Sequence, residues 1–126
     1  MRSETILLRQ VHPDFIPGGQ LTSQAFVPSE KDAGRCSVCD GDQITAEESY
    51  KHYTETLKRR SDSVWGVTCA EVSEVGLESA PDPLDEFPSH AVIDFTAHNK
   101  SKYRKLAKKL KAKALARGRL YPTQSG

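Results

Sequence analysis

The sequence contains no long hydrophobic run. Near its start, only three consecutive aliphatic residues, at positions 6–8, precede Arg9, which is too short a stretch for the apolar region of a signal peptide. No stretch approaches the roughly 20 apolar residues that a membrane span requires. We therefore expect a protein that stays in the cytoplasm and makes no membrane contact.

Cysteine is scarce, with three residues in 126. Cys36 and Cys39 have the two-residue spacing of a zinc knuckle, but a structural zinc needs four ligands. No second pair exists, so Cys69 and a distant histidine would have to complete the site. If this segment is a strand, positions 36 and 39 point to opposite faces. We expect no cofactor and interpret the cysteines as buried thiols, with zinc or a redox pair as alternatives.

Motifs that would identify an enzyme are also missing. There is no Walker loop, no dinucleotide-binding G-x-G-x-x-G and no G-x-S-x-G elbow for an activated serine. Four polar residues support an enzymatic alternative, a small hydrolase or nucleotide-handling enzyme with these side chains in one cleft between strands: His12, Ser23, Gln24 and His90. The interpretation that we favour gives the histidines a structural role in turns beside the strands.

Acidic residues are absent from the last part of the chain. All 17 of them lie before position 100, whereas 10 of the 18 basic residues lie between Lys100 and Arg119. Residues 1–99 therefore carry a net charge of −9 and the remainder carries +10. So uneven a charge distribution produces an electric field that selects partners by the sign of their charge, and a basic end most often attracts polyanions.

The remaining pattern indicates one α+β domain over residues 1–126, because a chain of this length supports one core. We predict a mixed or antiparallel sheet of about five strands and two main helices. The strands are expected at residues 5–12, 23–27, 35–39, 64–69 and 91–95, the helices at 45–60 and 101–117, and a short helical turn at 70–75. Residues 78–90 hold three prolines, which predicts an irregular connection. Asp94 is expected to pair with Lys100 or Arg104.

The first main helix begins with Thr45 and Glu48, which form a capping box. The second carries Leu106, Leu110 and Ala114 on one apolar stripe and lysines around most of its circumference. Its charges could contact an external polyanion, or the helix could instead pack against the acidic body of residues 1–99. The residues expected to bind a partner are Lys102, Lys105, Lys108, Lys109, Lys113 and Arg117.

Four sequence fragments carry a resemblance to known proteins: R-x-V-H-P at 9–13, S-x-A-F-x-P at 23–28, D-P at 82–83 and P-x-H-A at 88–91. Through them the chain resembles a set of small bacterial proteins labelled hypothetical. The resemblance spans most of residues 9–95 and leaves the basic end outside. It implies an α+β fold in a bacterial cytoplasm. It implies no activity, cofactor or catalytic residue.

From these observations we predict a non-enzymatic accessory or interaction protein. Its basic C-terminal helix, within residues 100–119, would contact nucleic acid or an acidic protein. A third possibility is an immunity or antitoxin-like module that binds another protein through the acidic body. That possibility predicts an exposed apolar or acidic patch larger than an ordinary monomer shows. The oligomeric state is left open by the sequence.

Overall fold

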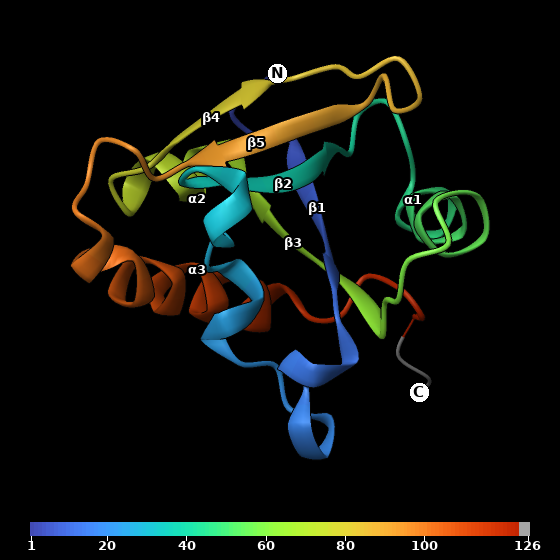
Figure 1. The fold of residues 1–126 in the computed structure, drawn as a ribbon, viewed down its shortest axis with the longest axis horizontal. Helices are drawn as coiled ribbons and strands as arrows, with labels where there is room; N and C mark the ends of the chain where they lie inside the picture. Colours follow the sequence, from blue (N-terminus) through green and yellow to red (C-terminus); the bar gives the residue numbers. More distant parts are fainter. Residues whose placement is uncertain (124–126) are drawn as a thin grey trace.

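The computed structural model describes residues 1–123. Five strands, three α-helices and several shorter turns follow one another along the chain (Figure 1). The strands are β1 (Ile6–Val11), β2 (Arg35–Asp40), β3 (Ser63–Thr68), β4 (Glu78–Pro81) and β5 (His90–Asp94). The helices are α1 (Ala46–Lys51), α2 (Cys69–Glu74) and α3 (Tyr103–Arg117). A π-helical turn, η5 (His52–Thr56), continues α1. The 3₁₀ turns are η1 (Pro13–Phe15), η2 (Pro17–Gly19), η3 (Ser23–Phe26), η4 (Glu30–Asp32) and η6 (Lys100–Lys102).

The strands form one antiparallel sheet in the order β3-β1-β2-β5-β4. Leu8 of β1 pairs with Cys39 of β2, and Cys39 pairs in turn with His90 of β5. The predicted α+β fold with about five strands is confirmed, and the sheet is antiparallel rather than mixed. Its register matters for the functional question because it fixes how far apart the two candidate histidines lie.

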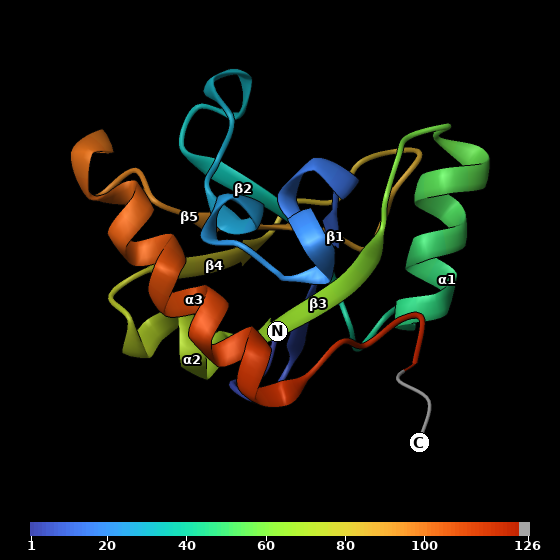
Figure 2. The ribbon, with the colours of Figure 1, turned by 90° about the horizontal axis from the view of Figure 1, so that it is seen from below.

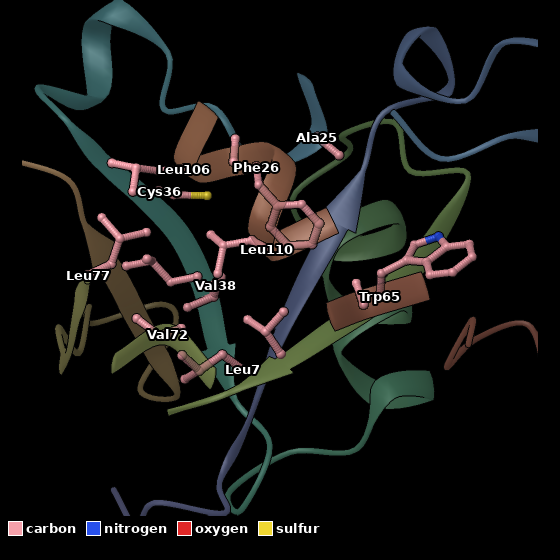
Figure 3. Close-up of a cluster of buried hydrophobic side chains, with 14 of the residues drawn as sticks. Leu7, Ala25, Phe26, Cys36, Val38, Trp65, Val72, Leu77, Leu106 and Leu110 are labelled. Atoms are coloured by element: carbon pink, nitrogen blue, oxygen red, sulfur yellow. The ribbon is translucent and has the colours of Figure 1, made fainter. Parts of the chain in front are cut away.

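Helices cover both faces of the sheet (Figure 2). The larger core lies on the face that carries α2, α3 and η3, where Leu7, Phe26 and Leu110 are fully buried (Figure 3). The smaller core lies on the other face, where Leu8, Cys39, Val64 and Phe87 pack against α1 and the C-terminal segment. The basic helix α3 is thus part of the main core and not an appended tail.

Capping residues set the starts of two helices. Thr45 accepts a hydrogen bond from the Glu48 amide while the Glu48 carboxylate accepts one from the Thr45 amide, so the predicted capping box of α1 is confirmed. Thr68 and Glu71 make the same reciprocal pair at the start of α2. Each box satisfies two amides that a helix start otherwise leaves without partners.

Three predictions of secondary structure were wrong in whole or in part. The helix predicted over residues 45–60 ends with η5 at Thr56, and residues 57–60 are not helical. Residues 23–27 form the 3₁₀ turn η3 instead of a strand. The segment predicted to be irregular contains strand β4, which ends at Pro81. Proline lacks an N–H group, but it is tolerated there because β4 is the edge strand of the sheet.

Asp94 has a different partner from the one expected. It lies 3.9 Å from Arg35 on the neighbouring strand and accepts hydrogen bonds from the hydroxyl and amide of Thr96. These hydrogen bonds from Thr96, aided by the charge of Arg35, lower the pKa of Asp94. Lys100 and Arg104 make no ion pair with it among residues 1–123. The cations of the last helix are therefore not used at this position.

Candidate functional site

Helix α3 docks on the sheet through the apolar stripe that the sequence predicted. Leu106, Ala107, Leu110 and Ala114 are buried, and Leu110 and Ala114 have no exposed surface. Tyr103 contributes an edge-on contact with Phe95 at a ring separation of 5.2 Å. The helix ends at Gly118, whose φ of 92° suits glycine. Burial of this stripe fixes which side of the helix faces solvent.

Two cations of the basic segment bind carboxylates of α2. Arg117 donates to Glu71 at 2.8 Å and to the carbonyl of Gly66 at 3.0 Å. Lys113 donates to Glu74 at 2.8 Å. Both residues belong to the predicted binding set, but the structure uses them to hold α3 against α2.

The Arg117 contact changes the acidity of its partner. Partial burial of Glu71 acts to raise the pKa of its carboxyl group, but hydrogen bonds from Arg117 and from the amide of Thr68 outweigh burial, so the pKa is lowered below 4.5. The other pair is more exposed, and its hydrogen bond raises the pKa of Lys113. The charged forms of Glu71 and Lys113 are therefore favoured in the folded protein.

The other cations of this segment are unpaired. Ten lie between positions 100 and 119, and after Lys113 and Arg117 are set aside, the remaining eight have no carboxylate within 4.0 Å among residues 1–123. Four of the eight belong to the predicted binding set and are exposed. We call these four residues the basic face: Lys102, Lys105, Lys108 and Lys109.

The exposed side of α3 offers little besides positive charge. Its exposed uncharged residues are Ala112, Leu115 and Ala116, and Ser101 is exposed in the preceding turn η6. Reading of base edges uses Asn, Gln or Arg in bidentate geometry, and reading of single strands uses aromatic platforms. Of these side chains the helix fully exposes only Arg104, and it fully exposes neither an amide nor an aromatic residue. The outer side of the helix is thus suited to phosphates and not to base sequence.

The four residues of the enzymatic alternative do not converge. His12 follows β1 and His90 begins β5, and β2 lies between these strands. Because His90 is level with Leu8 in the sheet, His12 is two strands and four residues away, roughly 16 Å. Ser23 and Gln24 lie in η3, on the face covered by α3. The cleft that this alternative requires does not form.

Both histidines make local hydrogen bonds. The Nδ1 atom of His12 accepts from the Asp14 amide at 3.0 Å and caps η1. The Nδ1 atom of His90 lies 2.8 Å from the carbonyl oxygen of Asp82, across the β4–β5 connection. These contacts hold turns in place, as the favoured interpretation predicted.

Arg9 has a structural role that the sequence did not reveal. It donates to the carbonyl of Ala25 at 2.7 Å and to that of Ser37 at 2.8 Å. It therefore ties the first fragment of the resemblance to the second, just as His90 ties the fourth to the third. The residues that carry the resemblance thus include contacts that hold loops to the sheet.

The cysteines do not form a metal site. Cys36 lies in the larger core and Cys39 in the smaller one, on opposite faces of the sheet as strand alternation predicts. Burial raises the pKa of both thiols, that of Cys39 to about 12. Cys69 begins α2 and packs against the larger core. Within residues 1–123, no three His, Cys, Asp or Glu side chains are grouped to hold a metal ion.

Two of the hollows on the surface of residues 1–123 bear on the functional question. The larger, about 590 Å³, is a shallow depression beside the N-terminus, and most of its charged side chains are engaged elsewhere, Arg2 with Asp42 and Glu74 with Lys113. The smaller, about 270 Å³, lies where α3 begins, against the segment that joins η3 to β2. Sequence reasoning missed it because its lining comes from segments about 70 residues apart.

Comparison with known proteins gives no match to a family model, to a curated protein or to a solved structure. In the described part of the chain, no helix has the length and apolar character needed to cross a bilayer. The large apolar residues that are exposed there, Met1, Leu84 and Leu115, lie on three separate segments. The functional argument therefore depends on the chemistry of the surface around α3.

Proposed function

We propose that this protein is a non-enzymatic accessory protein that contacts nucleic acid through the basic face of α3. The observation that carries the proposal is that eight of the ten cations in residues 100–119 have no internal carboxylate partner in the described chain. A helix with this many unpaired like charges is stabilised by an external anion, which relieves their mutual repulsion. Phosphates meet this need through counterion release.

Nucleic acid is favoured over an acidic protein by the composition of the surface. Protein interfaces owe most of their affinity to buried aromatic or aliphatic anchors at their centre. The basic face has no such residue, and Leu115 is the one large apolar side chain exposed on the helix. Contact with a phosphate backbone requires only cations. Binding of this kind is independent of sequence and would occur in the cytoplasm.

The negative charge of the acidic body, residues 1–99, favours one orientation of the protein on a bound nucleic acid. Residues 1–99 carry a net charge of −9, so the rest of the surface repels a polyanion while α3 attracts it. A duplex would therefore approach on one side of the molecule. The two internal pairs of α3, to Glu71 and Glu74, keep the helix fixed to the body during this contact.

The test is binding of a fluorescein-labelled 20-base-pair duplex, followed by anisotropy between 50 and 200 mM salt. We expect the logarithm of the association constant to fall linearly with the logarithm of the salt concentration. Substitution of Lys105, Lys108 and Lys109 by Gln should reduce the slope by about 0.9 for each lost phosphate contact. Affinity should fall with it.

A matched control removes the same charge elsewhere. Lys51, Arg59 and Arg60 are exposed cations on and after α1, away from α3 (Figure 2). Their substitution by Gln gives the same net charge as the α3 variant, so a general charge effect would weaken both variants equally. Equal weakening, or no binding by the unaltered protein, would reject the proposal.

A further inference from the structure

The hollow at the start of α3 contains polar groups that the fold does not use. It is lined by the cations Lys100 and Arg104, by the apolar residues Val27, Pro28 and Ala33, and by the polar residues Gln24 and Tyr103. Among residues 1–123, neither the Gln24 amide nor the Tyr103 hydroxyl has a hydrogen-bond partner, and neither cation has a carboxylate partner. Gln24, Lys100 and Arg104 are exposed and Tyr103 is half-buried, so all four groups face solvent and are free to contact a ligand.

The arrangement around Tyr103 is tight on one side. Gly34 has a φ of 82°, and a side chain at this position would come within 2.8 Å of the Tyr103 hydroxyl oxygen. The Tyr103 ring is held by its edge-on contact with Phe95. The ring is therefore held in place while its hydroxyl, which is half-buried and has no protein partner among residues 1–123, can donate to a ligand in place of water.

We propose that this hollow binds one nucleotide unit, with its phosphate at Lys100 and Arg104 and its base against Val27 and Pro28. The aliphatic walls suit a base face, and Gln24 and Tyr103 suit hydrogen bonds to a base edge. Glu30, which also lines the hollow, keeps the phosphate on the cationic side and accepts hydrogen bonds from base amino groups. The volume of about 270 Å³ is just below the roughly 300 Å³ of the smallest ligand pockets, so the hollow has room for one unit at most.

This inference extends the proposed function, on which it rests in part. A duplex keeps its bases stacked, so it reaches only the basic face, whereas a single strand can also place an unstacked base in the hollow. The unit could come from such a strand or from a free mononucleotide. The chemistry is the same in both cases, and the two sources are separated by experiment.

The experiment compares binding of a labelled single strand of 12 deoxyadenosines with binding of a 12-base-pair duplex. Two conservative variants remove one polar group each: Gln24→Ala at an exposed position, and Tyr103→Phe, which retains the ring contact with Phe95. We expect each to weaken single-strand binding about three- to tenfold, the effect of one lost hydrogen bond, and to leave duplex binding unchanged. Lys108→Gln, the matched control on the basic face, should weaken both.

Competition identifies the source and the role of the base. AMP should displace the single strand from the unaltered protein, and ribose 5-phosphate, which has no base, should not. If both variants bind the single strand as the unaltered protein does, the nucleotide pocket is refuted while the proposed function stands. If neither oligonucleotide binds but AMP shifts the NMR resonances of Gln24 and Tyr103, the pocket stands and the proposed function fails.

Discussion

The Arg117–Glu71 pair provides a quantitative test of how α3 is held. Substitution of Arg117 by Gln removes the hydrogen bonds to Glu71, at 2.8 Å, and to the Gly66 carbonyl, at 3.0 Å. The side chains of Arg117 and Glu71 are 24% and 19% exposed. Hydrogen bonds to charged groups contribute about 1.5–3 kcal/mol each, and solvent reduces this for a partly exposed pair. We expect the free energy of unfolding to fall by about 2 kcal/mol, or roughly 8 °C in Tm.

The same pair predicts a pH dependence with a definite sign. The pKa of Glu71 is lower in the folded protein than its ordinary value of 4.5. Its contribution to stability is therefore fully present above pH 4.5 and is lost as the pH falls through the folded-state pKa. The difference in stability between the unaltered protein and the Arg117→Gln variant should be largest above about pH 5 and should shrink toward pH 3.

Lys113→Gln is the control, because Lys113 makes the more exposed pair from the same helix to the same partner helix. Its side chain and that of Glu74 are 38% and 59% exposed, so we expect a loss below about 0.5 kcal/mol. Both variants would be measured by urea denaturation between pH 3 and pH 7. Equal losses for the two variants, or a loss in Arg117→Gln that does not vary with pH, would refute this account of the docking.

Two further predictions concern stability. Substitution of Arg9 by Met keeps the aliphatic stem but leaves the carbonyls of Ala25 and Ser37 without their donor, so the free energy of unfolding in urea should fall by about 2–4 kcal/mol. The control Arg35→Gln, at an exposed pair, should lower it by less than about 0.5 kcal/mol. Similar losses for the two variants would contradict the role given to Arg9. Lys58 follows η5 with a φ of 56°, so Lys58→Gly should raise stability by about 1 kcal/mol in thermal denaturation while Lys58→Ala should not. A gain with alanine equal to that with glycine would show that backbone strain is not the cause.

Local signals predicted the elements that depend on local chemistry. The capping box at Thr45, the apolar stripe of α3 and the stop at Gly118 are contained in short stretches of sequence, and each is present in the structure. Residues 23–27 have strand-forming composition, but they form η3, in which the Ala25 carbonyl accepts a hydrogen bond from Arg9, 16 residues away. Strand β4 forms despite its proline because β5 offers a free edge. Neither contact can be read from the segment itself.

The candidate site, like the fold, was predictable only where the signal lies within one short stretch of sequence. The charge pattern identified α3 as the cationic element but did not separate the cations that are used internally from those that are free. That separation depends on Glu71 and Glu74, which lie 46 and 39 residues from their partners. The hollow beside Tyr103 depends on Gly34 and on the turn at η3, so no pattern of neighbouring residues indicates it. Gln24 was named as a candidate, but for a cleft that does not form.

The most direct test of the central claim is a titration of the ¹⁵N-labelled protein with a 20-base-pair duplex at 50 mM salt, followed by NMR. The account predicts that the amide resonances of residues 102–109 shift progressively, that the shifts are reversed at 200 mM salt, and that residues on α1 are unaffected. Shifts that cluster on α1 or on the β4–β5 connection, or a spectrum that the duplex leaves unchanged, would contradict it.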